Sequence, residues 1–271
     1  MIVSKKRLDV MLFEKGFAES REKARAIIMA GKVYVDNQKI DKPGTLLKDD
    51  VKIECRNLPK AYVSRGGFKL EKAIKSFNIN LNDKITMDIG ASTGGFTDCM
   101  LQNGAKKVYA VDVGYGQLDW KLRNDLRVVN LERTNIRYID ENLVPCKVDF
   151  FSVDVSFISL KMVLPVARKF MSENATAVCL IKPQFEAGKE NVGKNGVVRD
   201  KNIHESVVVE ICDFVLNNGF DILGLDFSPI KGPKGNIEYL IYLKKSDEPQ
   251  NFLESDDINA LINISHMELN K

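Results

Sequence analysis

The sequence of 271 residues has few of the residues that build metal sites, disulfide frameworks or membrane spans. Its five cysteines stand far apart without any Cys-x-x-Cys pair, and it has two histidines, so neither a zinc site nor a disulfide scaffold is expected. No apolar run approaches the roughly 18 residues that a spanning helix needs. The basic N-terminus has no apolar segment behind it, which argues against a secretion signal. These absences predict a cytoplasmic protein with reduced thiols, no bound metal and no membrane partner.

The charges that are present are unevenly distributed along the chain. Residues 1–60 hold 14 Lys and Arg against 9 Asp and Glu, whereas the remainder holds 26 against 28. The length suggests one large domain or two unequal ones. A basic module joined to a nearly neutral body is typical of a protein in which one domain holds a phosphate backbone and the other carries out chemistry. A merely solvated basic surface would give the same count.

The basic module reads as a small α+β domain. Apolar residues at helical spacing predict a first helix that ends near Gly16, and Ser20 can cap a second one. Alternating polar and apolar residues then predict two strands, with a turn at Asp36-Asn37. The segment around Pro59 has no clear periodicity, so we expect a domain boundary there, with domains at 1–59 and 60–271. The expected elements are helices 7–16 and 20–31 and strands 32–36 and 51–54.

This module resembles the alpha-L RNA-binding motif of small-subunit ribosomal proteins and of many RNA-modifying enzymes. The resemblance covers about residues 5–55. It is carried by Arg7-Leu8-Asp9, Ser20-Arg21, Ala24, Ile27, Gly31, Val33 and Val35-Asp36. Arg21 and Arg25 lie four residues apart and therefore project from one helical face, where phosphates could dock. The residues expected to bind RNA are Lys6, Arg7, Arg21, Lys23, Arg25 and Lys32, together with Arg65 beyond the module.

Beyond the linker, strands and helices alternate, beginning with a helix after Gly67. Such alternation predicts an α/β fold, a mostly parallel sheet with helices on both faces. The last two strands follow each other without a helix, so we expect an antiparallel pair at one side of the seven-stranded sheet. The expected strands are 84–89, 107–112, 127–131, 148–153, 175–181, 220–226 and 237–243, with helices at 93–103, 159–172 and 203–217.

A glycine-rich turn, Met87-Asp-Ile-Gly-Ala-Ser-Thr-Gly-Gly-Phe96, joins the first of these strands to a helix at the sheet edge where ligands of such folds bind. Its glycines let the backbone approach a ligand closely. Asp112 ends the second strand 22 residues after Gly90, a spacing that suits hydrogen bonds to ribose hydroxyls. The spacing Gly-x-x-x-Gly-Gly disfavours a nicotinamide cofactor, and Asp88 resembles the acid that methyltransferases place near the methionine part of S-adenosylmethionine. The expected cofactor residues are Asp88, Gly90, Ser92, Thr93, Gly94 and Asp112.

Four charged residues stand where this fold usually carries catalytic groups. Each alone has a structural explanation, as a helix-face charge, a turn former or an edge-strand surface residue. Their surroundings, however, resemble the TlyA (hemolysin-A-like) family over nearly the whole chain, in Ser64-Arg-Gly-Gly-Phe-Lys69, Asp154-Val-Ser-Phe-Ile-Ser-Leu160, Ile181-Lys-Pro-Gln-Phe-Glu186 and Ser228-Pro-Ile-Lys-Gly-Pro-Lys-Gly-Asn-Ile-Glu238. In that family and in the related FtsJ-like methyltransferases, a Lys-Asp-Lys-Glu tetrad serves 2'-O-methylation of RNA. The matching residues here are Lys69, Asp154, Lys182 and Glu238.

The resemblance implies a class I, Rossmann-like methyltransferase that uses S-adenosylmethionine and acts on ribosomal RNA or ribosomal subunits, with a cytidine ribose as target. Methyl transfer from a sulfonium is an in-line displacement that chiefly demands alignment, and Lys182 is expected to hold the hydroxyl. Lys69 favours loss of the Lys182 proton, whereas Asp154 and Glu238 favour its retention. The sequence therefore leaves open whether Lys182 is a base or an orienting donor; we prefer orientation with late proton acceptance.

The sequence disfavours two alternative functions. A membrane-damaging hemolysin, suggested by the family name, is disfavoured by the lack of a secretion signal or span and by an acidic tail at 246–271. A non-catalytic ribosome-binding factor is disfavoured by the intact tetrad. Tyr115, Trp120 and Phe185 could stack on adenine or a target base, although core packing is the better explanation. The modified nucleotide, the ribosomal subunit and the oligomeric state are not determined by the sequence.

Overall fold

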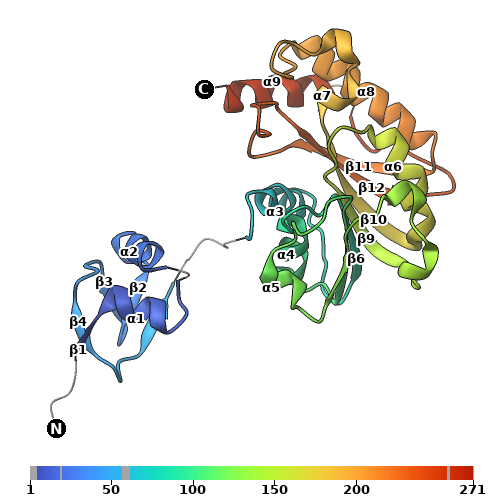
Figure 1. Cartoon of the computed structure of the whole chain (residues 1–271). Helices are drawn as coiled ribbons and strands as arrows, with labels where there is room; N and C mark the ends of the chain where they lie inside the picture. Colours follow the sequence, from blue (N-terminus) through green and yellow to red (C-terminus); the bar gives the residue numbers. More distant parts are fainter. Residues whose placement is uncertain (1–4, 19, 57–61, 255–256, 271) are drawn as a thin grey trace. The chain divides into compact units, whose positions relative to one another are not determined.

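The computed structural model describes residues 5–18, 20–56, 62–254 and 257–270, and it divides the chain into two compact units (Figure 1). The first unit comprises residues 1–61 and the second residues 62–271. The domain boundary expected near residue 60 falls within 57–61, which lies outside the described residues. Each unit has its own hydrophobic core.

The N-terminal unit is a small α+β domain, as expected. Its two helices pack on each other over a core to which both helices and the strands β2 and β5 contribute buried residues. The hydroxyl of Ser20 accepts a hydrogen bond from the backbone N–H of Lys23 and so caps the second helix. The elements are β1 (Lys5–Arg7), α1 (Leu8–Glu14), α2 (Arg21–Met29), β2 (Val33–Val35), β3 (Gln38–Ile40), β4 (Leu46–Lys48) and β5 (Ile53–Cys55).

A tight hairpin organises the strands of this unit. Asp36 and Asn37 connect β2 to β3 with φ angles of 49° and 67°, the left-handed conformation that a two-residue hairpin turn requires and that Asn and Asp tolerate. β2 pairs antiparallel with β3 on one side and with β5 on the other. The turn predicted at these two residues is therefore confirmed, while β1, β3 and β4 are short strands that the pattern did not predict.

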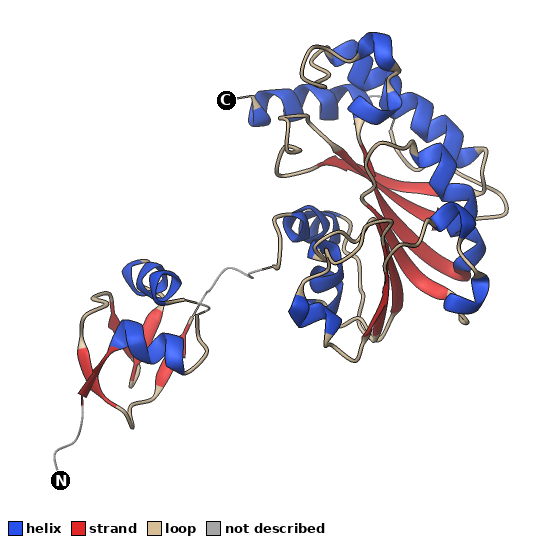
Figure 2. Cartoon of the chain, in the orientation of Figure 1, coloured by secondary structure: helices blue, strands red, loops and turns tan. Residues whose placement is uncertain are grey.

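The larger unit contains the expected seven-stranded, mostly parallel sheet (Figure 2). Its strand order is β11-β12-β10-β9-β6-β7-β8, and β12 runs antiparallel to both of its neighbours. The antiparallel pairing predicted for the last two strands is confirmed, with β11 at the edge. The strands are β6 (Ile85–Ile89), β7 (Lys107–Val111), β8 (Val128–Leu131), β9 (Val148–Val153), β10 (Met171–Ile181), β11 (Phe220–Phe227) and β12 (Tyr239–Lys245).

Helices cover both faces of this sheet and bury a separate core on each (Figure 1). Alternate residues of a strand serve opposite faces. Tyr109 and Val111 of β7 belong to the core under α6, α8 and α9, whereas Val108 and Ala110 belong to the core under α3, α4 and α5. The helices are α3 (Gly66–Ser76), α4 (Gly95–Gln102), α5 (Trp120–Arg123), α6 (Leu160–Ala167), α7 (Pro183–Glu186), α8 (Lys201–Leu216) and α9 (Asp257–Leu269).

Two expectations about element boundaries were wrong. The helix expected over 159–172 ends at Ala167 and continues as a short 3-10 turn, and the chain then enters β10 at Met171, which pairs with Val148 of β9. Sheet pairing, which depends on a distant segment, overrides the local helical pattern there. β12 begins at Tyr239, so Glu238 immediately precedes the last strand instead of lying within it.

The segment interpreted as an acidic tail contains the helix α9, which packs on α8 and β11. Ile262 is buried in the large core, and Ser265 lies 3.4 Å from the hydroxyl of the buried Tyr239. The signal was present in the sequence, because Ile258, Ile262, Ser265 and Leu269 follow helical spacing. Interpreting the segment by its number of acidic residues therefore missed an amphipathic helix.

Candidate active site

The glycine-rich turn lies at the carboxyl end of β6, where it meets the carboxyl end of β9. Gly90 has a φ of 87°, and a Cβ there would lie 2.6 Å from the backbone oxygen of Asp154. Gly94 has a φ of 94°, and its Cβ would meet the side chain of Leu122 at 2.2 Å. Both positions therefore require glycine. The close neighbours are atoms of the protein itself, a different reason from the ligand approach expected from the sequence.

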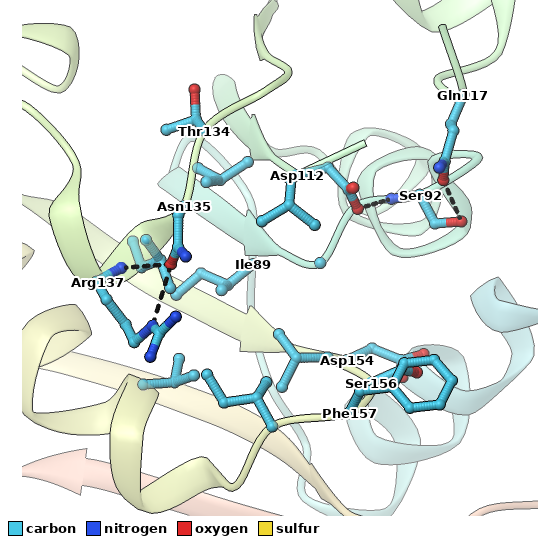
Figure 3. Close-up of a pocket in the computed structure, with 17 residues that line it drawn as sticks. Ile89, Ser92, Asp112, Gln117, Thr134, Asn135, Arg137, Asp154, Ser156 and Phe157 are labelled. Carbon is cyan, nitrogen blue, oxygen red and sulfur yellow. Dashed lines mark hydrogen bonds between the residues drawn. The ribbon is translucent and has the colours of Figure 1, made fainter. Parts of the chain in front are cut away.

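A cavity of about 460 Å³ opens beside this turn (Figure 3). Figure 3 shows Asp112 and Ser92 on one side of it and Asp154, Ser156 and Phe157 across from them. Its walls combine apolar strand-end residues with polar groups, the composition of a small-molecule site. The main lining residues are Ile89, Gly90, Ser92, Val111, Asp112, Gln117, Asn135, Ile136, Asp154, Ser156 and Phe157.

Asp112, the residue after β7, lines this cavity as the sequence placed it. Its Oδ2 accepts a hydrogen bond from the backbone N–H of Ser92 at 2.8 Å, and its Oδ1 accepts one from Gly114 at 2.6 Å. These two bonds hold the carboxylate in one orientation at the cavity wall. Each carboxylate oxygen has a further lone pair, so Asp112 can still accept hydrogen bonds from a ligand.

Asp88 lies beneath the turn, and its side chain is fully buried. Its Oδ2 accepts hydrogen bonds from the backbone N–H and the hydroxyl of Thr97, at 2.9 and 2.7 Å, and its Oδ1 accepts one from Ser152. Burial raises the pKa of Asp88 to about 7, although these hydrogen bonds oppose the shift. Asp88 is not among the residues that line either cavity described here. Its contact with a cofactor stays a prediction.

A second cavity, of about 330 Å³, brings the four predicted catalytic residues together. Lys69 comes from α3, Asp154 follows β9, Lys182 follows β10, and Glu238 precedes β12. Lys69 Nζ lies 2.7 Å from Glu238 Oε2 and 3.4 Å from Asp154 Oδ2, while Lys182 Nζ lies 2.6 Å from Asp154 Oδ1. Residues separated by as many as 169 positions thus form one continuous charge network.

The network pairs two amines with two carboxylates, and all four side chains are largely buried. The side chains of Lys69 and Lys182 are 9% and 8% exposed, and that of Glu238 is 1% exposed. Burial lowers the pKa of Lys69, but Asp154 and Glu238 together outweigh it and raise the pKa above its usual value. Burial likewise raises the pKa of Asp154, and the two lysines outweigh it and hold the pKa below its usual value. Lys69 and Asp154 are therefore both charged near neutral pH.

The two cavities share a wall. Gly90, Ser92, Asp154 and Ser156 line both of them, and the Ser156 hydroxyl accepts a hydrogen bond from Lys182 Nζ at 3.2 Å. Of the remaining predicted cofactor residues, Thr93 lines the second cavity, while Gly94 is the N-cap of α4. A molecule in the first cavity and a group in the second would meet at Asp154 and Ser156.

Glu186 is a residue of the recognised motifs to which the sequence assigned no role. It is the last residue of α7, the short helix that begins directly after Lys182. Its carboxylate accepts hydrogen bonds from the Ser159 hydroxyl at 2.6 Å and from the backbone N–H of Leu160 at 2.8 Å. Burial raises its pKa, with the bond from Ser159 opposing the shift. Glu186 thereby ties the segment that carries Lys182 to the loop that carries Asp154.

Phe157 lines the first cavity and belongs to one of the recognised motifs, although the sequence assigned it no role. Phe157 has a φ of 64°, rare for a residue with a side chain, and its largely exposed ring lies 5.0 Å from that of Phe185.

Core packing was the wrong explanation for Tyr115 and Trp120, which are 68% and 76% exposed. Gln117 and Asn135 also line the first cavity. Isolated polar residues in loops have no periodicity that would reveal them.

The residues expected to bind RNA fall into several groups. Lys6 pairs with Glu14 at 3.0 Å and with Asp49 at 3.7 Å. Lys32 is half-buried and immediately precedes β2, and Lys23 lies in the first turn of α2. Arg65 lies in the larger unit, where it lines the second cavity. The remaining three, Arg7, Arg21 and Arg25, converge on the carboxylate of Asp9.

Within the described ranges, no group of three or more His, Cys, Asp and Glu side chains could hold a metal ion. In that same part of the chain, none of the helices combines the length and the apolar character needed to cross a membrane.

Comparison with known proteins identifies relatives of both units. Residues 62–245 match the family model of the FtsJ-like methyltransferases, and residues 6–53 match that of the S4 domain. The chain is 49% identical to YqxC of Bacillus subtilis, covering 99% of this chain and 97% of that protein. It is 43% identical to the 16S/23S rRNA (cytidine-2'-O)-methyltransferase TlyA of Mycobacterium tuberculosis, covering 88% and 89%. A solved structure from Streptococcus thermophilus, which carries the name hemolysin, is 47% identical with a TM-score of 0.76 and covers 99% of this chain and 98% of that one.

Proposed function

Because this chain belongs to the FtsJ-like methyltransferase family, among the relatives named TlyA, we propose that it transfers a methyl group from S-adenosylmethionine to a ribose 2'-hydroxyl of ribosomal RNA. The observation that carries the proposal is the shared wall of the two cavities. A methyl donor in the first cavity and a ribose in the second would meet at this wall, where Asp154 and Ser156 lie beside Lys182. Such an arrangement supplies the alignment that an in-line displacement demands.

The first cavity fits the proposed cofactor by size and chemistry. It lies at the carboxyl ends of the parallel strands, where nucleoside ligands of this architecture bind, and its volume of about 460 Å³ suits a molecule of that size. Asp112 would accept hydrogen bonds from the ribose hydroxyls, and Ile89, Val111 and Ile136 would pack against the apolar parts. When bound, S-adenosylmethionine supplies a methyl group made electrophilic by its positively charged sulfur.

The tetrad would act on the acceptor. Lys182 holds the 2'-hydroxyl oxygen in line with the methyl group, and Asp154 and Ser156 hold the Lys182 amine in place through bonds of 2.6 and 3.2 Å. Lys69 keeps the Asp154 carboxylate oriented and charged, and Glu238 holds Lys69 in place. As the new C–O bond forms and the methyl–sulfur bond breaks to leave a neutral thioether, the hydroxyl proton would become acidic. Lys182 would accept that proton and give one of its own to the Asp154 carboxylate, 2.6 Å away. The buried site excludes most water from these groups, which strengthens each electrostatic contact.

The N-terminal unit and the relatives support the choice of ribosomal RNA as the substrate. Part of this chain is 44% identical over 61 residues to the small ribosomal subunit protein uS4 of Dehalococcoides mccartyi, and the Mycobacterium tuberculosis relative is named for a cytidine target. We therefore propose that the N-terminal unit binds ribosomal RNA or a ribosomal subunit and that a cytidine is modified. Such an enzyme acts in the cytoplasm, where the ribosomes are. The catalytic scheme assigns no step to a metal.

The test is transfer of a tritiated methyl group from S-adenosylmethionine to ribosomal RNA, with Lys182→Ala as the decisive variant. We expect kcat to fall at least about 100-fold because the hydroxyl loses its orienting group, while cofactor affinity measured by calorimetry stays within about threefold, since Lys182 does not line the first cavity. Lys75→Ala, which removes an exposed lysine of α3 paired with Glu71, is the matched control.

Turnover of Lys182→Ala within about tenfold of the natural protein would contradict the assignment of Lys182. Failure of the natural protein to bind S-adenosylmethionine or to methylate ribosomal RNA would contradict the proposed function itself. A liposome-leakage assay run in parallel tests the activity that the name hemolysin suggests, and mapping of 2'-O-methyl positions in the product identifies the nucleotide.

A further inference from the structure

Three arginines of the N-terminal unit converge on one carboxylate. Asp9 lies in the first turn of α1 and accepts a two-pronged contact from Arg7, with Nε at 2.9 Å from Oδ1 and Nη2 at 3.0 Å from Oδ2. Arg21 and Arg25 approach the same carboxylate from α2, with Arg21 Nη2 at 3.5 Å and Arg25 Nε at 3.8 Å from Oδ2. A single anion thus gathers three cations from two elements.

The depth of the groups differs across this cluster. The Asp9 side chain is fully buried, whereas the side chains of Arg7, Arg21 and Arg25 are 44%, 56% and 58% exposed. Hydrogen bonds from Arg7 hold the pKa of Asp9 below its usual value, so the carboxylate is charged at neutral pH. One negative charge balances one of three positive charges. The cluster therefore carries a net charge of about +2, and its three arginine side chains are about half exposed.

Local sequence builds this arrangement. Arg21 and Arg25 occupy positions four apart on α2 and so project from the same face. Buried apolar residues of α1 and α2 form the common core that fixes the two helices side by side. The backbone N–H of Asp9 donates to the carbonyl of Pro43 at 3.1 Å, which anchors the start of α1. The backbone of Asp9 is thus held by the fold, independently of the arginines.

We propose that Arg7, Arg21 and Arg25 form a single binding site for a phosphate of an RNA backbone, and that Asp9 is the positioning residue of this site. The inference rests on the proposed RNA-binding function of the N-terminal unit. Long arginine side chains lose much rotational freedom when they bind. Asp9 restricts that freedom in advance and leaves the remaining donors of each planar group to face one anion, which is how preorganisation strengthens binding.

Replacement of Asp9 gives opposite results under the two possible roles. Asp9→Asn removes a negative charge from a surface that binds a polyanion, so long-range electrostatics alone would strengthen RNA binding. If Asp9 positions the arginines, the same change releases them and weakens binding. The exposed Asp41, in the same unit, provides the matched control, because Asp41→Asn changes the net charge equally without touching the arginine cluster.

The experiment measures the fluorescence anisotropy of a fluorescein-labelled RNA stem–loop titrated with the full chain at several KCl concentrations. We expect Asp9→Asn to bind about fivefold more weakly than the natural protein, with a plot of log affinity against log salt that is shallower by about one phosphate contact. Asp41→Asn is expected to bind equally or slightly more tightly. Circular dichroism and the thermal midpoint verify that each variant is folded.

Each outcome decides a separate question. If Asp9→Asn binds as tightly as Asp41→Asn, the positioning role is overturned while RNA binding by the unit stands. If the natural protein does not bind the stem–loop, the proposed RNA-binding function fails instead. Should Asp9→Asn lose its fold, Arg21→Gln and Arg25→Gln replace it: one shared phosphate site requires that the double variant lose much less than the product of the single losses, and independent effects would overturn the proposal.

Discussion

The two units of this protein use the same kind of interaction, a cation paired with a carboxylate, at opposite depths. In the N-terminal unit the arginines around Asp9 are about half exposed. In the larger unit Lys69 and Lys182 are less than one-tenth exposed, and each is paired with a carboxylate. Exposed guanidinium groups keep donors for an external anion, whereas the buried amines are held in one geometry. The first arrangement suits contact with a flexible phosphate backbone, and the second suits alignment of a single hydroxyl.

Depth also sets the energetic consequence of breaking a pair. An exposed ion pair contributes little to stability, because water solvates both charges almost as well after separation. Removing one partner of a buried pair leaves an uncompensated charge in a poorly solvated site and is strongly destabilising. The comparison between the units can therefore be tested by matched substitutions, taken here from the largest expected effect to the smallest.

The largest effect is expected at Lys69. Lys69→Met leaves the buried carboxylate of Glu238 without the partner that lies 2.7 Å away, so we expect the free energy of unfolding to fall by about 3 kcal/mol. Asp154 also loses one of its two lysines, and kcat should fall at least about 100-fold. Urea denaturation and the methyl-transfer assay provide the two measurements.

The double variant Lys69→Met, Glu238→Gln separates stability from catalysis. It removes the uncompensated charge, so most of the lost stability should return while turnover stays low. A single variant Lys69→Met that unfolds like the natural protein would show that the network is far better solvated than its burial indicates.

A smaller effect, with a distinctive pH dependence, is expected at Asp88, a buried carboxylate without a cationic partner among the contacts of the described residues. Its pKa is raised from 3.8 to about 7, so the folded state binds this proton more tightly than the unfolded state does. Stability contributed by the protonated form is present at low pH and is lost as the pH rises from about 4 to about 7. Asp88→Asn cannot ionise, so its thermal midpoint should exceed that of the natural protein by more at pH 8 than at pH 5.5.

The three hydrogen bonds to Thr97 and Ser152 remain possible for asparagine, since its oxygen can accept from Thr97 and its amide can donate to the Ser152 hydroxyl. Thermal unfolding at both pH values makes the comparison. An identical difference between the two proteins at pH 5.5 and pH 8 would contradict the raised pKa.

The smallest effect is expected at the exposed pair of Lys52 and Glu54 in the N-terminal unit. The two groups lie 2.7 Å apart, the same distance as in the buried pair of Lys69 and Glu238, but the Lys52 side chain is 74% exposed. Lys52→Ala should leave the thermal midpoint unchanged within error, because solvent screens the pair and Arg56 also contacts Glu54. A loss comparable to that of Lys69→Met would mean that distance, and not depth, governs these pairs.

The sequence predicted most of the helices and strands of this protein, but it missed the helix α9 and the end of one helix. The alternation of strands and helices predicted all seven strands of the sheet, and the recognised motifs predicted the four residues that meet in the second cavity. The helix α9 was missed because the segment was interpreted from its number of acidic residues and not from the helical spacing of Ile258, Ile262 and Leu269. The end of the helix at Ala167 was missed because pairing of Met171 with Val148 is a long-range contact.

What the sequence by itself determined is local: where strands and helices form, where glycine is required, and which residue types stand at the ends of strands. These properties depend on neighbours a few positions away, and periodicity records them. Only the tertiary structure decided that Asp154 faces both cavities while Asp88 points into the core, that Lys69 meets Glu238, and that three arginines share Asp9. These contacts and side-chain orientations depend on strand order and helix packing, which bring together segments far apart in the chain.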